Sequence, residues 1–293
     1  MKPSVPVFFD PAIPRKSKFV NKLVSLGKFP LPSVIEISES GTCNRVCSFC
    51  PRSDPSYPDE KKFISKKLIE KITNELQQLE YSGLILFSGF VEPLLDKSIY
   101  SHIKTISEGL PKCRIELVTN GDVLNPARLK RLFKSGLSTL LISVYDGPDE
   151  AIAFQKMCSE AELMPEQYVI RHRYLPKENN FGITLNNRSG MMNNAAFAIP
   201  SVLEPLNEPC YYPHYTFFID YLGDVLICPH DWGKKRIAGN LLNESFIDIW
   251  MGKVFSSARE HLGKGNRIMS PCTLCDVKGT LMGEVHKVAW DEC

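Results

Sequence analysis

The sequence predicts an α/β protein built around a parallel β-sheet. From Ser33 to about Asn187, short apolar runs alternate with segments whose apolar residues recur every three or four positions. Short apolar runs are typical of buried strands, and the longer spacing is typical of amphipathic helices. Alternating strands and helices favour parallel pairing, because each helix carries the chain back to start the next strand. The hydrophobic content of 43% is sufficient for such a core.

Strand-like runs and helix-like segments follow one another through this region. We expect strands at 34–37, 83–87, 114–119, 139–144, 168–174 and 182–185. We expect helices at about 65–79, 97–108, 125–135 and 149–163. Ser65 is a suitable N-cap for the first helix, and Asn125 followed by Pro126 is a start signal for the third. Ligands in such folds gather at the carboxyl ends of the strands, so functional residues should follow them.

The pattern changes after about Met191, where prolines become frequent. Within 217–227 we expect two short strands around a turn at Gly223 and Asp224, and we expect a helix at about 245–262. We therefore divide the chain into an N-terminal extension (1–32), an α/β unit (33–190) and a small α+β domain that carries cysteines (191–293).

Charge and composition exclude several classes of function. The net charge of +2 gives no strong field for nucleic acid or for an anionic membrane surface. No apolar run approaches the roughly 20 residues that span a bilayer, and the first residues do not resemble a secretory signal. Ten cysteines without such a signal indicate a reducing cytoplasm and metal ligation rather than disulfides. We expect a cytoplasmic protein that binds neither nucleic acid nor membrane.

The most informative motif is the C-x3-C-x2-C run of Cys43, Cys47 and Cys50, directly after the first expected strand. Three thiolates on one short loop can hold a 4Fe–4S cluster and leave one iron open for a small molecule. Zinc usually takes four ligands in two close pairs, so a lone triad is unusual for it. A zinc site and simply buried thiols stay the alternatives.

The motif resembles that of the radical S-adenosylmethionine (radical SAM) superfamily. This resemblance implies an open (β/α)6 partial TIM barrel and a 4Fe–4S cluster whose open iron binds S-adenosylmethionine (SAM). It also implies reductive cleavage of SAM to a 5′-deoxyadenosyl radical, which abstracts a hydrogen atom from the substrate.

Several residues match positions that bind SAM in that family. Phe49 matches an aromatic position beside the adenine. Gly89 and Glu92 match a glycine–glutamate motif after the second strand, which binds the SAM amino group. Val91 stands where the family often has glycine, and valine tolerates positive φ poorly.

Three further residues follow the later strands. By the same resemblance, Asn120 and Ser143 line the SAM and substrate cavity. Arg188 lies in an Asn-Arg-x-Gly motif, and its guanidinium is suited to pair with the SAM carboxylate. A surface salt bridge is the alternative role for Arg188.

A second set of cysteines lies in the small domain and consists of Cys210, Cys228, Cys272 and Cys275. Its spacing, and the helix expected between the two pairs, resemble the SPASM/twitch extension of radical SAM enzymes. The resemblance implies one auxiliary 4Fe–4S cluster with no open iron. A zinc site of four cysteines is also permitted by the spacing.

Cys113, Cys158 and Cys293 are left outside both sets. Free cysteines are usually small buried hydrophobes. Cys293 could instead donate a hydrogen atom to a substrate radical, as thiols do in radical epimerases.

The family resemblance implies an enzyme, and most relatives of this type modify ribosomally synthesised peptides by epimerisation, crosslinking or backbone excision. We therefore expect a peptide substrate. The alternatives are a dehydrogenase or epimerase of an aminosugar, an aminocyclitol or another small molecule, and a non-enzymatic iron–sulfur or zinc scaffold. A peptide substrate would need a separate leader-binding partner, because the segment before Val34 is too short to fold as such a domain. A reductase or flavodoxin-type protein would supply electrons.

Overall fold

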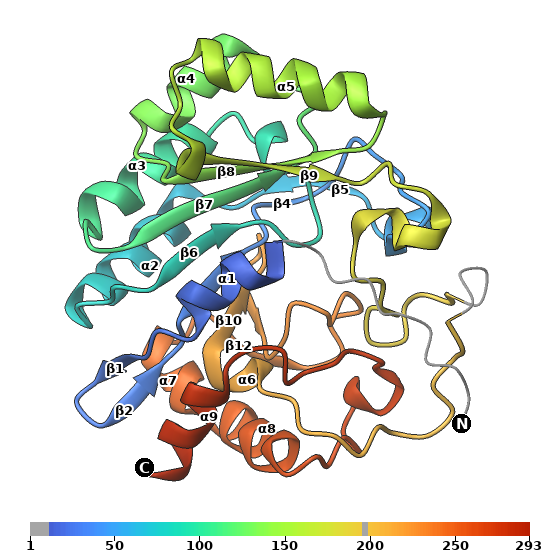
Figure 1. Cartoon of the computed structure of the whole chain (residues 1–293). Helices are drawn as coiled ribbons and strands as arrows, with labels where there is room; N and C mark the ends of the chain where they lie inside the picture. The colour runs from blue at the N-terminus through green and yellow to red at the C-terminus, as the bar shows by residue number, and fades with distance from the viewer. Residues whose placement is uncertain (1–11, 195–198) are drawn as a thin grey trace.

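An eight-stranded sheet runs through the computed structural model, which describes residues 12–194 and 199–293. In spatial order its strands are β12 (Ile237–Asn240), β11 (Asp224–Leu226), β10 (Thr216–Ile219), β3 (Val34–Ile37), β6 (Leu84–Phe87), β7 (Arg114–Thr119), β8 (Thr139–Val144) and β9 (Tyr168–His172). Neighbouring strands from β10 to β9 are parallel, and β11 and β12 continue the sheet antiparallel. The sheet curves as a partial barrel (Figure 1), which confirms the expected fold class.

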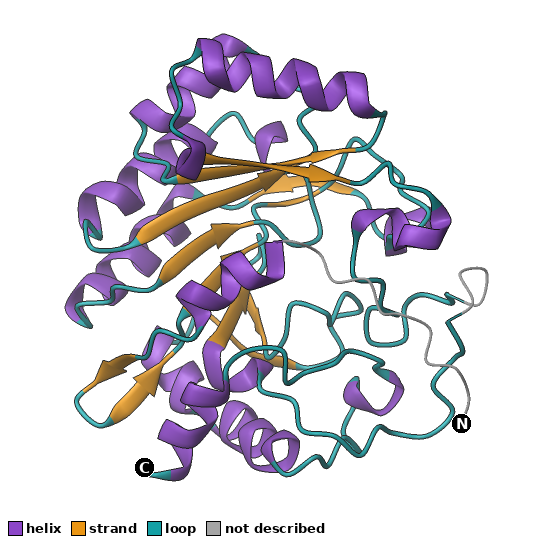
Figure 2. Ribbon diagram, in the orientation of Figure 1, coloured by secondary structure: helices purple, strands orange, loops and turns teal. Residues whose placement is uncertain are grey.

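The connections between successive parallel strands are helical, and these helices cover the outer face of the sheet (Figure 2). They are α2 (Lys66–Gln78), α3 (Ile99–Gly109), α4 (Pro126–Lys134) and α5 (Pro148–Glu160). The side chains of Ser65 and Asn125 accept hydrogen bonds from backbone N–H groups of α2 and α4, so both expected N-caps form. The apolar faces of the helices pack against the strands in the main hydrophobic core.

The sixth parallel strand comes from a different part of the chain than the sequence indicates. Residues 182–185 form no strand, and Lys177–Gly182 is a 3-10 turn in which Gly182 has a φ of +73°. A Cβ on Gly182 would stand 1.8 Å from the carbonyl oxygen of His172, so the chain folds tightly against the end of β9. β10 takes the sixth place by pairing with β3. The strand expected at 182–185 is therefore wrong, because a short apolar run does not distinguish a strand from a packed turn.

The region after residue 191 extends this sheet. After the short helix α6 (Tyr212–Tyr215), β10 and β11 form the hairpin expected around Gly223 and Asp224. The single helix expected at 245–262 is instead two helices, α7 (Phe246–Met251) and α8 (Lys253–Gly263), because Gly252 between them is extended. The domain limits 1–32, 33–190 and 191–293 stay predictions. Strands from both sides of position 190 belong to one sheet.

In the described part of the N-terminal segment, the first helix reaches the cavity side of the sheet and the hairpin after it contacts the C-terminal helix. This segment forms α1 (Ala12–Val20) and the hairpin of β1 (Val24–Leu26) and β2 (Phe29–Leu31). Arg15 on α1 donates a hydrogen bond of 2.9 Å to Glu116 on β7. The C-terminal helix α9 (Glu284–Asp291) contacts β2.

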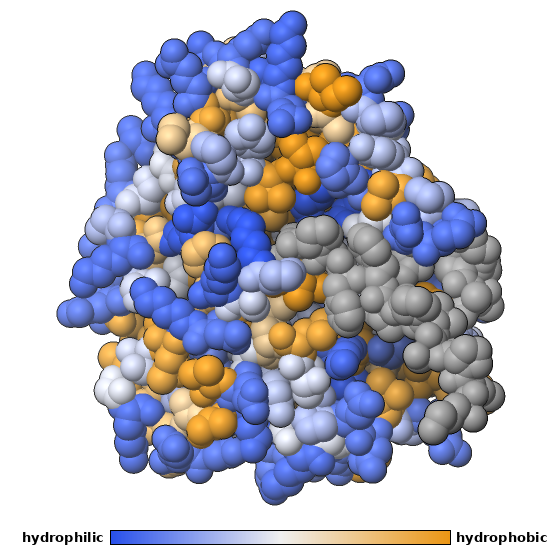
Figure 3. Space-filling model, viewed as in Figure 1, coloured by the Kyte–Doolittle hydropathy of each residue, from blue (hydrophilic) through white to orange (hydrophobic). Residues whose placement is uncertain are grey.

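Two observations concern a membrane, namely the hydropathy of the surface and the length of the helices. On the face shown in Figure 3, hydrophilic side chains cover much of the rim, and apolar side chains show toward the middle. Within residues 12–194 and 199–293, no helix has the length and apolar character needed to cross a membrane.

Candidate active site and metal centres

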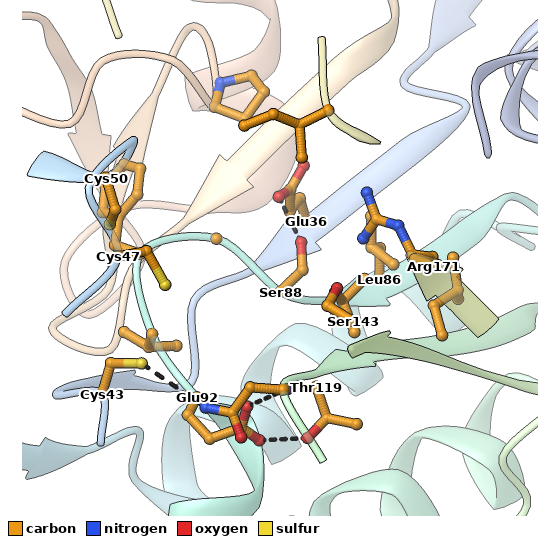
Figure 4. A pocket seen from close by; sticks show the side chains of 18 of the residues that line it. Glu36, Cys43, Cys47, Cys50, Leu86, Ser88, Glu92, Thr119, Ser143 and Arg171 are labelled. Carbon is orange, nitrogen blue, oxygen red and sulfur yellow. Dashed lines mark hydrogen bonds between the residues drawn. The ribbon is translucent and has the colours of Figure 1, made fainter. Parts of the chain in front are cut away.

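A cavity of about 380 Å³ lies at the carboxyl ends of the barrel strands. Its walls include every residue that the sequence analysis assigned to SAM or to the first cluster, namely Cys43, Cys47, Cys50, Phe49, Gly89, Glu92, Asn120, Ser143 and Arg188. Figure 4 shows the three cysteines on one side of this cavity, with Glu36, Ser88, Ser143 and Arg171 across from them. The fold thus brings together side chains that are widely separated in the sequence.

The cysteine loop follows β3 and is held in place by two arginines. A two-residue strand, β4 (Ser40–Gly41), pairs with β5 (Glu60–Phe63), and the three cysteines lie half-buried between them. Arg45 donates hydrogen bonds to the carboxylates of Asp122 and Asp146. Arg52 donates to the carbonyl oxygens of Phe90 (2.7 Å) and Gly41 (2.9 Å). The loop is therefore anchored on the strand ends around it.

The second set of cysteines surrounds a separate cavity of about 20 Å³, whose walls include Cys210, Cys228, Cys272 and Cys275. Arg267, which is only 2% exposed, also lines it. Its guanidinium donates hydrogen bonds of 2.9–3.1 Å to the backbone carbonyls of Glu208, Pro209 and Val277. One buried side chain thus ties the segment before Cys210 to the segment after Cys275.

The sulfur atoms of both sets are spread too widely for a single zinc ion. Zinc–sulfur bonds of about 2.3 Å in a tetrahedron place the sulfurs about 3.8 Å apart. Among the described residues, no three cysteine Sγ atoms lie within 4.8 Å of one another. A 4Fe–4S cluster does not need so close an approach, because its cysteines bind different irons. Burial raises the pKa of Cys47 and of Cys272 to about 12, so a positively charged metal centre is needed to keep them as thiolates.

The glycine–glutamate motif after β6 has a clear structural basis. The positive φ falls on Gly89 (98°) and not on Val91, so valine at that position causes no strain. Glu92 is 1% exposed, and its carboxyl accepts hydrogen bonds from Leu94 N (2.9 Å), Thr119 Oγ1 (2.7 Å) and Asn120 N (2.7 Å). Glu92 therefore joins the ends of β6 and β7 behind the cavity.

The other predicted SAM-binding residues point at the cavity from different elements. The ring of Phe49 stacks on that of Tyr145 at 6.2 Å. The amide of Asn120 donates to Asn44 Oδ1 (2.8 Å) and lies 3.9 Å from Cys43 Sγ. The guanidinium of the half-buried Arg188 lies over the ring of Trp232, and desolvation lowers its pKa. Arg188 is thus not on the surface, as a surface salt bridge would require.

The two cavities are neighbours that share one wall. Tyr212 lines both of them. In the turn after Asn187, Arg188 lines the large cavity and Ser189 the small one. The Asn187 side chain fixes this turn by donating to Leu274 O (2.6 Å), between the last two cysteines.

The remaining cysteines lie away from the large cavity. Cys158 is fully buried in the core, and Cys113 donates to the carbonyl oxygen of Tyr81, as is usual for packed thiols. Cys293 is exposed at the chain end, where its Sγ lies 2.9 Å from Lys28 O. The structure therefore does not bring Cys293 to the cavity, where a hydrogen donor would have to stand.

Sequence reasoning missed several polar residues of the cavity, notably Glu36 on β3 and Arg171 on β9. Their signal is present in the sequence, because each is a charged residue inside an apolar run. In a strand, alternate residues face the same side, so Glu36 points opposite to Ile35 and Ile37, into the barrel. Charged residues at such positions mark the concave side of a barrel.

Comparison with family models supports this assignment of the two regions. The radical SAM superfamily model matches residues 37–186, and the model of an iron–sulfur cluster-binding (SPASM) domain matches residues 210–276. These matches give the protein SAM and 4Fe–4S clusters as cofactors, and they make it an enzyme rather than a scaffold.

Known proteins resemble the chain over most of its length. The S-adenosyl-L-methionine-dependent 2-deoxy-scyllo-inosamine dehydrogenase of Niallia circulans is 29% identical over 245 residues, covering 83% of this chain and 92% of that protein. The crystal structure of BtrN in complex with AdoMet and 2-DOIA is 28% identical, with a TM-score of 0.70, and the match covers 85% of this chain and 95% of that one. The AdoMet-bound structure of anSMEcpe shares the fold alone, with 12% identity and a TM-score of 0.53 over 89% of this chain and 92% of that one. The chain belongs to the radical SAM superfamily and carries a SPASM-type iron–sulfur domain.

Proposed function

We propose that the protein is a radical SAM dehydrogenase that oxidises a hydroxyl group of a small aminocyclitol or amino sugar to a ketone. The observation that carries this proposal is the similarity to 2-deoxy-scyllo-inosamine dehydrogenase, which extends over 92% of that enzyme. The cavity of about 380 Å³ must hold SAM as well as the substrate, so the part of the substrate that enters it must be small.

Peptide modification, our main expectation from the sequence, has weaker support. It rested on the frequency of peptide substrates among relatives, whereas the comparisons favour the small-molecule alternative. A separate leader-binding partner would be needed only for a peptide substrate. The proposal keeps a reductase or flavodoxin-type electron donor and a cytoplasmic location, where cysteines that form no disulfide stay reduced.

The chain's own residues divide the cavity into a side for the cofactors and a side for the substrate. When bound, SAM and the first cluster supply a radical that removes a hydrogen atom from an unactivated carbon. Cys43, Cys47 and Cys50 hold that cluster, and Phe49 and Asn120 orient SAM beside it. Ser143 and Arg171 are paired neighbours on β8 and β9, and they face the opposite side.

The second cysteine set has a role in the electron balance of this reaction. Oxidation of an alcohol to a ketone removes two hydrogens and two electrons. The hydrogen on carbon leaves as an atom and takes one electron with it. The other leaves as a proton, and one electron needs an acceptor. Cys210, Cys228, Cys272 and Cys275 are placed to hold that acceptor, because their cavity adjoins the large one and Tyr212 lines both.

The proposal is tested with the anaerobically reconstituted enzyme, SAM, dithionite and 2-deoxy-scyllo-inosamine. We expect the ketone and 5′-deoxyadenosine to form in equal amounts, as measured by mass spectrometry. The Cys47→Ala variant is the control and should form neither. Formation of 5′-deoxyadenosine without any oxidised cyclitol would contradict the proposed substrate, and modification of a peptide in its place would restore the first expectation.

A further inference from the structure

Two glutamates lie at the same level inside the barrel, but they differ in their partners. In the sheet register, Glu36 on β3 pairs with Leu86 on β6, which pairs with Glu116 on β7. Both glutamates are buried, with exposures of 6% and 2%, and both line the large cavity. Their backbone positions are therefore equivalent, and only their surroundings distinguish them.

Glu116 is neutralised by the protein itself. Arg15 on α1 donates to its Oε2 at 2.9 Å, and Arg114 on the same strand donates to its Oε1 at 2.6 Å. A carboxylate with two guanidinium partners has its charge balanced and its oxygens satisfied. Glu116 is thus part of the wall that joins α1 to the sheet.

Glu36 has no such partner in the described part of the chain. Its carboxylate accepts one hydrogen bond, from Ser88 Oγ at 2.5 Å, and it takes part in no ion pair there. Arg188 lines the same cavity, and its charge acts on Glu36 through space, but no ion pair joins the two side chains among the described residues. A carboxylate that accepts a single hydrogen bond has lone pairs left for a further donor. An ammonium group on a ligand in the cavity could donate to them directly.

We propose that Glu36, held in position by Ser88, binds the amino group of the substrate and sets the preference for amine-bearing polyols. This inference rests on the proposed function, whose substrate class carries both an amine and hydroxyl groups. Figure 4 shows Glu36 and Arg171 on different walls of the same cavity, so a small cyclitol between them would meet a carboxylate and a guanidinium at different positions on its ring. The ammonium fits the first of these groups, and hydroxyl oxygens fit the second.

The experiment compares two ligands by calorimetry on the reconstituted enzyme with SAM and no reductant. The ligands are 2-deoxy-scyllo-inosamine and the same cyclitol with a hydroxyl in place of the amine. The wild type should bind the amine about ten- to a hundredfold more tightly, the range expected for a charge-assisted contact. In Glu36→Gln this ratio should fall to near one. In Glu116→Gln, the matched control at the same level, it should not change.

Each result decides the inference. An unchanged ratio in Glu36→Gln, or no preference for the amine in the wild type, would overturn it, while turnover of the amine would leave the proposed function standing. Failure of the wild type to bind either cyclitol would instead reject the proposed function and this inference with it. Should Glu36→Gln fold poorly by circular dichroism and iron content, Ser88→Ala provides the second variant. It frees the carboxylate of Glu36 and should lower the ratio several-fold.

Discussion

The two cysteine sites use the same ligand atom but differ in number and in free space. The loop site has three half-buried cysteines on the wall of a cavity of about 380 Å³. The second site has four cysteines around a cavity of about 20 Å³. Three ligands beside an open cavity leave room for a small molecule on the metal group, whereas four ligands around a closed one do not. The contrast teaches that the first site has space for a ligand beside its metal group, whereas the second encloses its group with protein.

The arginines that anchor the two sites also differ, because one lies near the surface and the other is buried. Arg45 anchors the loop site through carboxylates near the surface, one of which has a side chain 62% exposed. Arg267 anchors the second site through three backbone carbonyls and is almost completely buried. We expect a substitution of the exposed arginine to cost little stability. A substitution of the buried arginine should cost more, because it leaves buried carbonyls without donors.

The largest effect should follow from replacing Cys43, Cys47 and Cys50 together with alanine. Formation of 5′-deoxyadenosine should fall to the level without enzyme, because the open site is gone. About four irons per chain should remain, since thiolate ligation is local to each site. Product analysis by chromatography and iron analysis check the two parts. Undiminished formation of 5′-deoxyadenosine would show that the open site lies elsewhere.

The complementary change, Cys272→Ala with Cys275→Ala, should separate the two roles. The iron content should fall from about eight to about four per chain, and SAM cleavage should continue. Oxidised product should be lost, because the remaining electron has no acceptor. The measurement is the ratio of ketone to 5′-deoxyadenosine. A ratio that stays near one would mean that the second site plays no part in the electron balance.

Arg267→Lys tests the buried support. Lysine reaches at most part of the three carbonyls that Arg267 satisfies, so buried acceptors lose their donors. We expect the free energy of unfolding to fall by about 2–4 kcal/mol and the second iron complement to be lost preferentially. Urea unfolding and iron analysis provide the measurements. Loss of iron from the loop site instead would show that Arg267 does not specifically anchor the second site.

A pH titration tests the carboxyl that lies behind the open site. Burial raises the pKa of Glu92 from its ordinary value of 4.5 to about 7. Between these values the folded state binds more protons than the unfolded state, so this group makes stability fall as the pH rises toward and through 7. In Glu92→Gln the fall in unfolding free energy from pH 6 to 8 should be smaller by about 1 kcal/mol. Burial also raises the pKa of Glu39 to about 7, so part of the slope should remain. An unchanged slope would mean that Glu92 stays ionised in the fold.

The sequence predicts these elements well where a local signal controls them. The caps at Ser65 and Asn125, the strands that alternate with helices, and the two cysteine motifs are all set by short-range pattern or spacing. The sixth parallel strand was missed because the pairing of β10 with β3 joins residues about 180 positions apart. Local periodicity contains no information about such a pairing.

The candidate site shows the same division. Motifs predicted residues for SAM and for the clusters, and these residues line the two cavities, but Glu36 belongs to no motif. Its importance appears only when its neighbours are known, because Glu116 has two arginines and Glu36 has none in the described chain. The break at Gly252 between α7 and α8 is likewise invisible to helical spacing, since the apolar positions continue on both sides.

Arg45→Lys should give the smallest effect and sharpens the comparison most directly. Arg45 donates to both Asp122 and Asp146 and lies 4.9 Å from the centre of the Tyr145 ring. Lysine keeps the charge but loses the planar fork, so we expect the unfolding free energy to fall by about 1 kcal/mol or less. At about 1 M salt, where the screening length is only about 3 Å, the difference from wild type should shrink further. The loss in Arg267→Lys should persist in the same salt, because its contacts are buried. Equal losses in the two variants, or a salt-independent loss in Arg45→Lys, would show that the loop site is not supported from the surface.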